Sequence, residues 1–332
     1  MGEFDLIERY FKRPARRAAL GIGDDCALLQ PSPGTQWAIS SDMLVEGRHF
    51  LSTVDPFKLG HKALAVNLSD LAACGAKPVA FTLALALPRA DEAWLAPFSK
   101  GLLALADLHG CELVGGDTTQ GPLNICITVF GEVPAVGGRS QALLRSGAKP
   151  GDDLYVSGTV GDARLALEVF RGTVSVPAPV FDAARLRMEQ PTPRVALGLA
   201  LRGVATSAID VSDGLLGDLG HLLKQSGVGA TVDVLKAVNL IAALASYTDL
   251  GAPFDAEIPS TDWQRWALSG GDDYELLFTA PAAHREAVAL AAEQSQTPVT
   301  CIGQIDAQRG LRLVDAQGQA LPNDFTSFDH FA

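Results

Sequence analysis

Apolar residues recur along the chain with two different periods, and these periods predict alternating helices and strands. Apolar side chains at helical spacing predict helices over residues 3–12, 56–73 and 92–109. Shorter apolar runs bounded by proline, glycine or polar residues predict strands over residues 37–41, 79–87, 113–114 and 124–132. The loops between them are too irregular for a doubly wound sheet, so we expect an α+β layer with helices on one face.

The pattern changes character near residue 150, where a turn-rich connector runs from Arg145 to Asp152. We therefore predict one domain over residues 1–147 and a second over residues 148–332. The second half has the patterns of three helices and four strands, with a surface loop at 172–179: helices over 162–170, 194–202 and 215–226, and strands over 153–157, 206–211, 275–279 and 299–305.

A polar motif recurs where apolar runs stop. Small residues and then aspartate follow such runs in six places, which end at Asp25, Asp42, Asp70, Asp117, Asp213 and Asp273. One such motif is typical of a turn or a helix cap, but six together indicate a shared cause. We expect the acids to stand where strands end, and the Gly115–Gly116 pair to let a ligand approach the main chain. Asp70 instead stands in a predicted last helical turn, where a carboxylate opposes the helix dipole; this indicates a compensating cation or a side chain that faces solvent.

Composition narrows the classes of function. The chain has 332 residues, of which 48% are hydrophobic and 19% charged, as in globular proteins. A formal net charge of −12 disfavours nucleic-acid binding. Because no run approaches ~18 apolar residues and no secretory signal is evident, we expect a cytoplasmic protein that does not bind membranes. The five cysteines are scattered, so we expect them to be reduced and mostly buried.

Oxygen-only ligands without histidine or cysteine favour a hard ion such as Mg²⁺, the usual partner of a nucleotide polyphosphate. The segment from Gly21 to Asp25 is superficially like a dinucleotide loop, but Cys26 replaces its third glycine, and a metal-holding loop remains possible. The sequence has neither a P-loop nor a kinase glycine loop. Phosphates would then be held through metal ions and isolated cations such as Arg145 and Lys149, unless these are only surface charges near the connector.

Six motifs together resemble the bacterial thiamine-monophosphate kinases, in the same order and over nearly the whole chain. They are Gly21-Ile22-Gly23-Asp24-Asp25-Cys26-Ala27, Ser41-Asp42, Asn67-Leu68-Ser69-Asp70, Gly115-Gly116-Asp117-Thr118-Thr119, Asp210-Val211-Ser212-Asp213-Gly214 and Ser269-Gly270-Gly271-Asp272-Asp273-Tyr274-Glu275. The resemblance implies the fold of the aminoimidazole ribonucleotide synthetase superfamily, with an N-terminal α+β domain, a C-terminal α/β domain and a homodimer formed by pairing N-terminal sheets. It also implies ATP-dependent phosphorylation of thiamine monophosphate to thiamine diphosphate, assisted by several Mg²⁺ ions.

The resemblance also implies roles for individual residues. The implied Mg²⁺ ligands are Asp25, Asp42, Asp70, Asp117, Asp210 and Asp213, assisted by Ser40 and Ser41. The implied ATP contacts are Gly116, Asp117, Arg145 and Ser212, and the implied thiamine monophosphate contacts are His49, Asp272 and Phe328. The family often has glutamate where this chain has Asp272 and tyrosine where it has Phe328. No covalent nucleophile is expected, because an acceptor phosphate is already anionic near neutral pH.

Two alternatives remain open. The first is a sister activity on the same scaffold: aminoimidazole ribonucleotide synthetase, selenophosphate synthetase or a hydrogenase-maturation enzyme. Selenophosphate synthetase would show a reactive cysteine beside a lysine near the N-terminus, and the maturation enzyme a C-terminal cysteine, and this sequence has neither pattern. The second is a non-catalytic protein that binds nucleotide or metal, which ATP binding without turnover would reveal.

Overall fold

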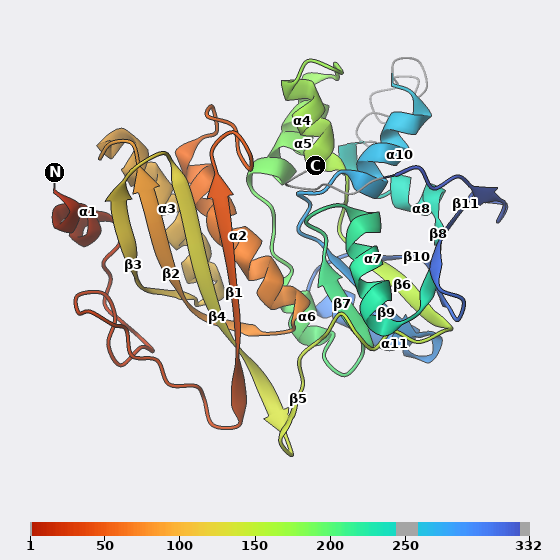
Figure 1. The fold of residues 1–332 in the computed structure, drawn as a ribbon, viewed down its shortest axis with the longest axis horizontal. Helices are drawn as coiled ribbons and strands as arrows, with labels where there is room; N and C mark the ends of the chain where they lie inside the picture. The colour runs from red at the N-terminus through yellow and green to blue at the C-terminus, as the bar shows by residue number, and fades with distance from the viewer. Residues whose placement is uncertain (1, 244–257, 326–332) are drawn as a thin grey trace. The chain divides into compact units, whose positions relative to one another are not determined.

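The computed structural model describes residues 2–243 and 258–325 (Figure 1). The chain forms two compact units. The N-terminal unit comprises Met1–Leu71 and Ala76–Ala142, and the C-terminal unit comprises Ala72–Gly75 and Leu143–Ala332. Apart from Ala72–Gly75, the second unit begins at Leu143, whereas the sequence predicted that the second domain begins at residue 148. Among the described residues, no helix is both long and apolar enough to cross a membrane.

A mixed sheet forms one layer of the N-terminal unit, in the order β1–β4–β2–β3, with β5 paired to β4. Its strands β2 and β3 are parallel and the other pairs are antiparallel. The strands are β1 (Thr35–Val45), β2 (Lys77–Leu87), β3 (Glu112–Gln120), β4 (Asn124–Val136) and β5 (Arg139–Ser140). The helices are α1 (Glu3–Tyr10), α2 (Pro56–Ala73) and α3 (Glu92–His109).

Helices α2 and α3 cover one face of this sheet (Figure 1). Alternate residues of β2, among them Phe81, Leu83 and Leu85, are buried beneath them. Two glycines let the helices pack backbone to backbone, since a Cβ atom on Gly60 would lie 2.1 Å from the Phe98 carbonyl oxygen, and one on Gly101 would lie 1.9 Å from that of Phe57. The predicted layer of one sheet with helices on one face is confirmed.

The other face of this sheet carries Ile39, Ser41 and Met43 of β1, and we call it the open face. Ile39 is 60% exposed and Met43 is 52% exposed, values that are unusual for large apolar side chains on a sheet. Phe130 of β4 lies opposite Ile39 in the register and packs edge to face on Trp37.

The C-terminal unit is built on a second sheet, which has the order β12–β11–β8–β10–β6–β9–β7 within the described residues. Its strands are β6 (Asp152–Ser157), β7 (Ser207–Asp210), β8 (Gly229–Asp233), β9 (Leu276–Pro281), β10 (Val299–Asp306), β11 (Gly310–Val314) and β12 (Ala320–Leu321). Its helices include α4 (Asp162–Phe170), α5 (Ala178–Glu189), α6 (Val195–Ala200), α7 (Leu215–Ser226), α8 (Val234–Val238), α10 (Ser260–Ser269) and α11 (Arg285–Gln294). Strand β6 lies between β10 and β9, and all of its residues are buried.

Several sequence predictions about the ends of elements are wrong. Asp42 and Asp117 do not end their strands, because the ladders continue past them: Asp42 lies opposite Ile127, and Asp117 lies opposite Ala84. The apolar run before Asp272 and Asp273 is the end of helix α10 rather than of a strand. The predicted loop at 172–179 is also too long, because α5 begins at Ala178.

None of the five cysteines, all of which lie in the described ranges, forms a disulfide, but the prediction that most are buried is wrong. Only Cys111 is buried, and Cys26 is exposed. Burial raises the pKa of the Cys111 thiol to about 12, so this thiol is protonated at neutral pH.

Candidate functional site

Two of the predicted acids meet between β1 and α2 in the N-terminal unit. The Ser40 hydroxyl donates a hydrogen bond to the Asp70 carboxylate. Two residues further along β1, the backbone N–H of Asp42 donates to the side-chain oxygen of Asn67 at 3.0 Å. Asn67 is 1% exposed and its amide nitrogen donates to the Ala63 carbonyl oxygen at 3.0 Å, which fixes its orientation. Ser40, Asp42 and Asp70 therefore lie together on the helix-covered face of the sheet. We call them the β1–α2 cluster.

Ser41 and Asp117 lie on the open face instead. The Ser41 hydroxyl lies 3.0 Å from that of Thr128, its partner on β4. Asp117 shares a register row with Ala84, Cys126 and Met43, which places it on that same face. Because β1 and β3 are opposite edges of the four-strand path, Asp117 lies three strand spacings, about 14 Å, from β1. Within one chain, Asp117 does not join the β1–α2 cluster.

Gly116, beside Asp117, is required by the sheet itself. Its φ is +150°, and a Cβ atom there would lie 1.9 Å from the Leu83 carbonyl oxygen on β2. The close approach of two strands thus explains this glycine without a ligand. A contact between Gly116 and ATP stays a prediction.

The structure describes two of the three other predicted residues of the N-terminal motifs and the C-terminus, Asp25 and His49. Asp25 is an exposed loop residue whose backbone N–H donates to the Asp24 carboxylate at 2.9 Å. His49 closes the turn after β1: its Nδ1 accepts from the Val45 N–H at 3.0 Å, so the proton of the neutral ring is on Nε2. Phe328 lies outside the described residues.

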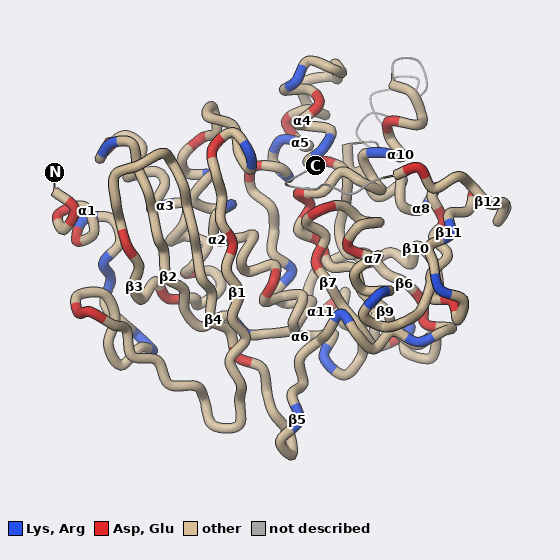
Figure 2. Tube along the Cα trace, viewed as in Figure 1, with Lys and Arg blue, Asp and Glu red and all other residues tan. Residues whose placement is uncertain are grey.

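In the C-terminal unit, two motifs that are about 60 residues apart in sequence pack backbone to backbone. The Asp272 N–H donates to the Ser212 carbonyl oxygen at 2.7 Å, and the Tyr274 N–H donates to the Val211 carbonyl oxygen at 2.8 Å. Asp210, at the end of β7, is 5% exposed. In Figure 2, several acidic positions lie together where β7 leads into α7. We call the paired segments 210–214 and 270–275 the double loop.

The double loop holds two residues in a strained conformation. Asp272 has φ of +63° and Tyr274 has φ of +52°, the left-handed region that side chains other than glycine rarely adopt. Glu275, which is fully buried, holds the end of this segment. Its carboxylate accepts from Arg187 at 2.6 Å and from Arg194 at 2.6 Å. We did not single out Glu275 or these arginines from the sequence, although Glu275 stands inside the last motif.

Two further buried carboxylates shape the double loop. Asp218 accepts from the N–H groups of Ser212 and Asp213, both at 3.0 Å. Desolvation, followed by the charge of Asp213, raises the pKa of Asp218 to about 7, although Arg145 and the two N–H donors act in the opposite direction. Asp273 accepts from the Gly161 N–H at 2.9 Å, and complete burial raises the pKa of its carboxyl well above the usual range. The sequence did not indicate Asp218, which lies outside the repeated motif.

The donor set suits Mg²⁺ in its chemistry. All of the candidate ligands are carboxylate or hydroxyl oxygens, which a hard cation prefers. Across residues 2–243 and 258–325, no three histidine, cysteine or acidic side chains come together closely enough to hold a metal ion alone. Mg²⁺ commonly takes only one or two protein carboxylates, however, and completes its shell with waters and substrate phosphates. The residues present therefore fit a cation that is held jointly with a phosphate.

The two folded units and their acidic motifs define a protein of the AIR synthase related class. The sequence family of AIR synthase related proteins, N-terminal domain, matches residues 23–133. The family of AIR synthase related proteins, C-terminal domain, matches residues 149–316.

Similar proteins identify the family within this class. The thiamine-monophosphate kinase of Salmonella typhimurium is 48% identical, over 100% of this chain and 98% of its own length. The chain belongs to the thiamine-monophosphate kinase family. The crystal structure of thiamine-monophosphate kinase from Stenotrophomonas maltophilia has a TM-score of 0.81 and 45% identity, and covers 92% of each chain. AaThiL complexed with AMPPCP and TMP has a TM-score of 0.75 and 28% identity, over 91% of this chain and 89% of that one.

Proposed function

We propose that this protein transfers the terminal phosphoryl group of ATP to thiamine monophosphate, which yields thiamine diphosphate and ADP. Family membership over the full length supports the proposal. The observation that carries it is the pairing of acidic motifs that are distant in sequence: Ser40 with Asp70 in one unit, and Ser212 with Asp272 in the other. Bringing acidic motifs close together is costly unless a cation or a positively charged substrate compensates their charge.

The reaction needs charge neutralisation more than it needs a base. The acceptor phosphate is already anionic near neutral pH, so the main obstacle is the repulsion between two phosphorylated compounds. Bound Mg²⁺ would supply Lewis-acid neutralisation of the phosphate oxygens. We propose that its ligands come from Asp25, Asp42, Asp70, Asp117, Asp210 and Asp213, with the hydroxyls of Ser40 and Ser41.

Hydrogen bonds within the chain fix the orientation of the proposed ligands before substrates bind. The Ser40 hydroxyl orients the Asp70 carboxylate, and Asn67 fixes the backbone at Asp42. In the C-terminal unit, Asp218 holds the N–H groups of Ser212 and Asp213. A site that is positioned before the substrates arrive does not have to reorganise during the reaction, and this is a main source of rate enhancement.

We assign the substrate contacts by family motif. Gly116, Asp117, Arg145 and Ser212 would contact ATP, and His49, Asp272 and Phe328 would contact thiamine monophosphate. The charge of Arg145 acts on Asp218, so this arginine lies near the double loop and could meet a phosphate there. The strained backbone of Asp272 supports a functional role, because strain of this kind often persists at binding sites.

A steady-state assay tests the function. Purified protein with ATP, Mg²⁺ and thiamine monophosphate should release ADP in step with thiamine diphosphate, whereas unphosphorylated thiamine should give no product. Saturable ATP binding without ADP release would instead show a non-catalytic nucleotide-binding protein. ADP release without thiamine diphosphate would show a different acceptor and a sister activity.

We also propose that the protein is a homodimer that pairs two open faces. Ile39 and Met43 leave an apolar surface on this face that a second copy would bury. With a two-fold axis along the strands, the β3 edge of one copy would lie over the β1 edge of the other. Asp117 of a second copy would then approach Ser41, from which it is remote within one chain.

A further inference from the structure

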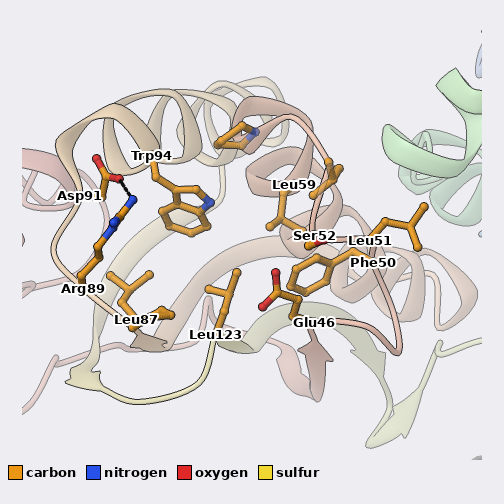
Figure 3. A pocket seen from close by; sticks show the side chains of 13 residues that line it. Glu46, Phe50, Leu51, Ser52, Leu59, Leu87, Arg89, Asp91, Trp94 and Leu123 are labelled. Atoms are coloured by element: carbon orange, nitrogen blue, oxygen red, sulfur yellow. Dashed lines mark hydrogen bonds and ion pairs between the residues drawn. The ribbon is translucent and has the colours of Figure 1, made fainter.

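The assigned substrate contact Asp272 lies in a backbone segment that needs support from the residues around it. Asp272 and Tyr274 both have positive φ values, and such a conformation persists only where neighbouring groups impose it. The cavity of about 470 Å³ in the N-terminal unit, shown in Figure 3, has no assigned substrate contact among its lining residues. Asp273, which lies between the two strained residues, connects them to a supporting loop in the C-terminal unit.

This supporting loop consists of residues 158–161, which connect β6 to α4. Its backbone N–H groups donate to carboxylates of the double loop. The Gly161 N–H donates to Asp273 at 2.9 Å, and the Thr159 N–H donates to Glu275 at 3.4 Å. N–H groups of a glycine-containing loop at a helix N-terminus often bind a phosphate. Here they bind acidic side chains of the same chain.

Two glycines fix the shape of the supporting loop. Gly161 has φ of +86°, and a Cβ atom there would lie 2.9 Å from the backbone carbon of Trp266 on α10. Gly158 has φ of +52°, and a Cβ atom there would lie 2.2 Å from the Glu275 carboxylate. The loop is therefore enclosed by α10 and by Glu275, so the N–H group that Asp273 accepts from has a fixed position.

The Asp273 carboxyl group makes this bond at a cost in free energy. Asp273 is 3% exposed, and only one of its two side-chain oxygens has a hydrogen-bond partner among the described residues. Burial of an unsatisfied carboxyl oxygen is unfavourable, and the negative charge of Asp162 makes ionisation of Asp273 less favourable still. An apolar side chain would fill the position at a lower cost, so the bond to Gly161 is what explains the carboxyl group.

The double loop is thus anchored at three points. The Asp272 N–H donates to the Ser212 carbonyl oxygen, and Glu275 is held by two arginines at the other end of the strained stretch. Asp273 is the anchor between them, and its bond to Gly161 is the one that directly follows Asp272 in sequence.

We propose that Asp273 is a positioning residue: by accepting from Gly161 it fixes the backbone at Asp272 and so directs the Asp272 side chain toward thiamine monophosphate. The inference rests on the proposed function and deepens it, because Asp273 acts through Asp272 rather than on the substrate. Without this bond, Asp272 would relax toward the negative φ values that it prefers, while the two outer anchors keep the double loop folded.

Steady-state kinetics of matched variants tests this role. Asp273→Ala removes the acceptor, whereas Asp273→Asn keeps an oxygen that can accept from the Gly161 N–H. The control is Asp152→Ala, since Asp152 is also buried and accepts from the Lys149 N–H at 2.9 Å. Asp152 lies at the opposite end of β6 from the supporting loop. Its loss therefore removes a comparable buried hydrogen bond without touching the double loop.

We expect Asp273→Ala to raise the KM for thiamine monophosphate at least tenfold, while kcat and the KM for ATP stay within threefold of wild type. Asp273→Asn should keep all three constants within threefold, and Asp152→Ala should keep them even where it lowers the thermal melt. If Asp273→Ala does not fold, Asp273→Ser makes the same test, because its side chain is too short to reach Gly161. An equal rise in both KM values, the same rise in Asp152→Ala, or no recovery in Asp273→Asn would overturn the inference.

Calorimetric binding of thiamine monophosphate without ATP separates this inference from the proposed function. Asp273→Ala should weaken binding at least tenfold. Adding Asp272→Ala to it should cause little further loss, because the effects of a residue and of the residue through which it acts are not additive. This pattern without turnover in the wild-type protein would support the positioning role and refute the proposed function. Normal wild-type turnover with additive losses, or with unchanged binding in Asp273→Ala, would refute the positioning role alone.

Discussion

Single carboxylates in this protein orient the backbone as well as carrying charge. Asp218 shows this most directly, because it lies under the turn that carries Ser212 and Asp213 and accepts both of their N–H groups. It is 3% exposed, so ionising it costs desolvation energy that the two donors only partly return. The turn is thus held by a group whose charge depends on pH.

Asp218 should make the stability of the metal-free protein depend on pH. Its pKa is about 7 in the folded state against 3.8 for an ordinary aspartate, so the folded state binds more protons than the unfolded state between these values. The free energy of unfolding should therefore fall as pH rises from about 4 to about 7, by up to about 4 kcal/mol from this group. Asp218→Asn should flatten this part of a denaturant-midpoint profile. An unchanged slope in the variant would show that other groups cause the dependence.

The implied metal ligands should be separable from the structural acids by substitution. Asp42→Asn and Asp213→Asn remove a charge but keep the shape, so each should lower kcat at least about 100-fold while the thermal melt stays within about 2 °C. Asp182→Asn, on the exposed surface of α5, serves as the control and should retain activity. Near-normal turnover in either test variant would refute its assigned role.

At the level of elements, the sequence predicts helices better than strand ends. The bounds of α2, α3, α4 and α7 agree with the prediction, because an apolar stripe with period 3.6 stops where the helix stops. Strands β1 and β3 continue through polar residues, since hydrogen bonding to the next strand maintains them there. Strands β8 and β11 were not predicted, because their alternation of apolar and polar residues covers only five residues each.

Predicting the site from sequence has the same limit. The repeated motif identifies Asp42, Asp70 and Asp213 because each ends a recognisable run. The motif could not reveal that Asp42 and Asp117 lie on opposite faces of the N-terminal sheet. The face on which a side chain lies depends on strand register and, here, on a register shift between Phe81 and Thr82. Asp218 was missed for a similar reason: its partners are N–H groups, which no sequence pattern displays.

Neighbouring glycines of β3 allow a test of the tight pairing between β2 and β3. Gly116→Ala would place a Cβ atom 1.9 Å from the Leu83 carbonyl oxygen, whereas a Cβ atom on Gly115 would meet only the Thr82 methyl group, at 3.9 Å. We expect Gly116→Ala to lower the free energy of unfolding by about 1–3 kcal/mol and Gly115→Ala to change it by less than about 1 kcal/mol. Chemical denaturation measures both. Equal effects would contradict the register described for this pair.

At the scale of the whole molecule, the arrangement of the sheet leaves Asp117 on β3 remote from Asp42 on β1. A second copy would explain both this separation and the exposed apolar side chains of the open face. The formal net charge of −12 opposes such pairing, so the burial of Ile39 and Met43 would have to outweigh the repulsion between the two copies.

Size-exclusion chromatography with light scattering measures the mass of the protein in solution and so tests the homodimer. The wild-type protein should have twice the mass of one chain, and Ile39→Glu combined with Met43→Glu should have the mass of one chain and little activity. Leu108→Glu is the matched control, since Leu108 is 77% exposed on α3. It should remain dimeric. A wild-type monomer with full activity would rule out the proposed role of the open face.

The transfer itself is tested most directly by ³¹P NMR of a reaction with ATP that carries ¹⁸O in its γ-phosphoryl group, together with Mg²⁺ and thiamine monophosphate. We predict that the isotope-shifted signal moves from ATP to the terminal phosphate of thiamine diphosphate, and that none appears in free phosphate. Label released as inorganic phosphate, with thiamine monophosphate unchanged, would contradict the account.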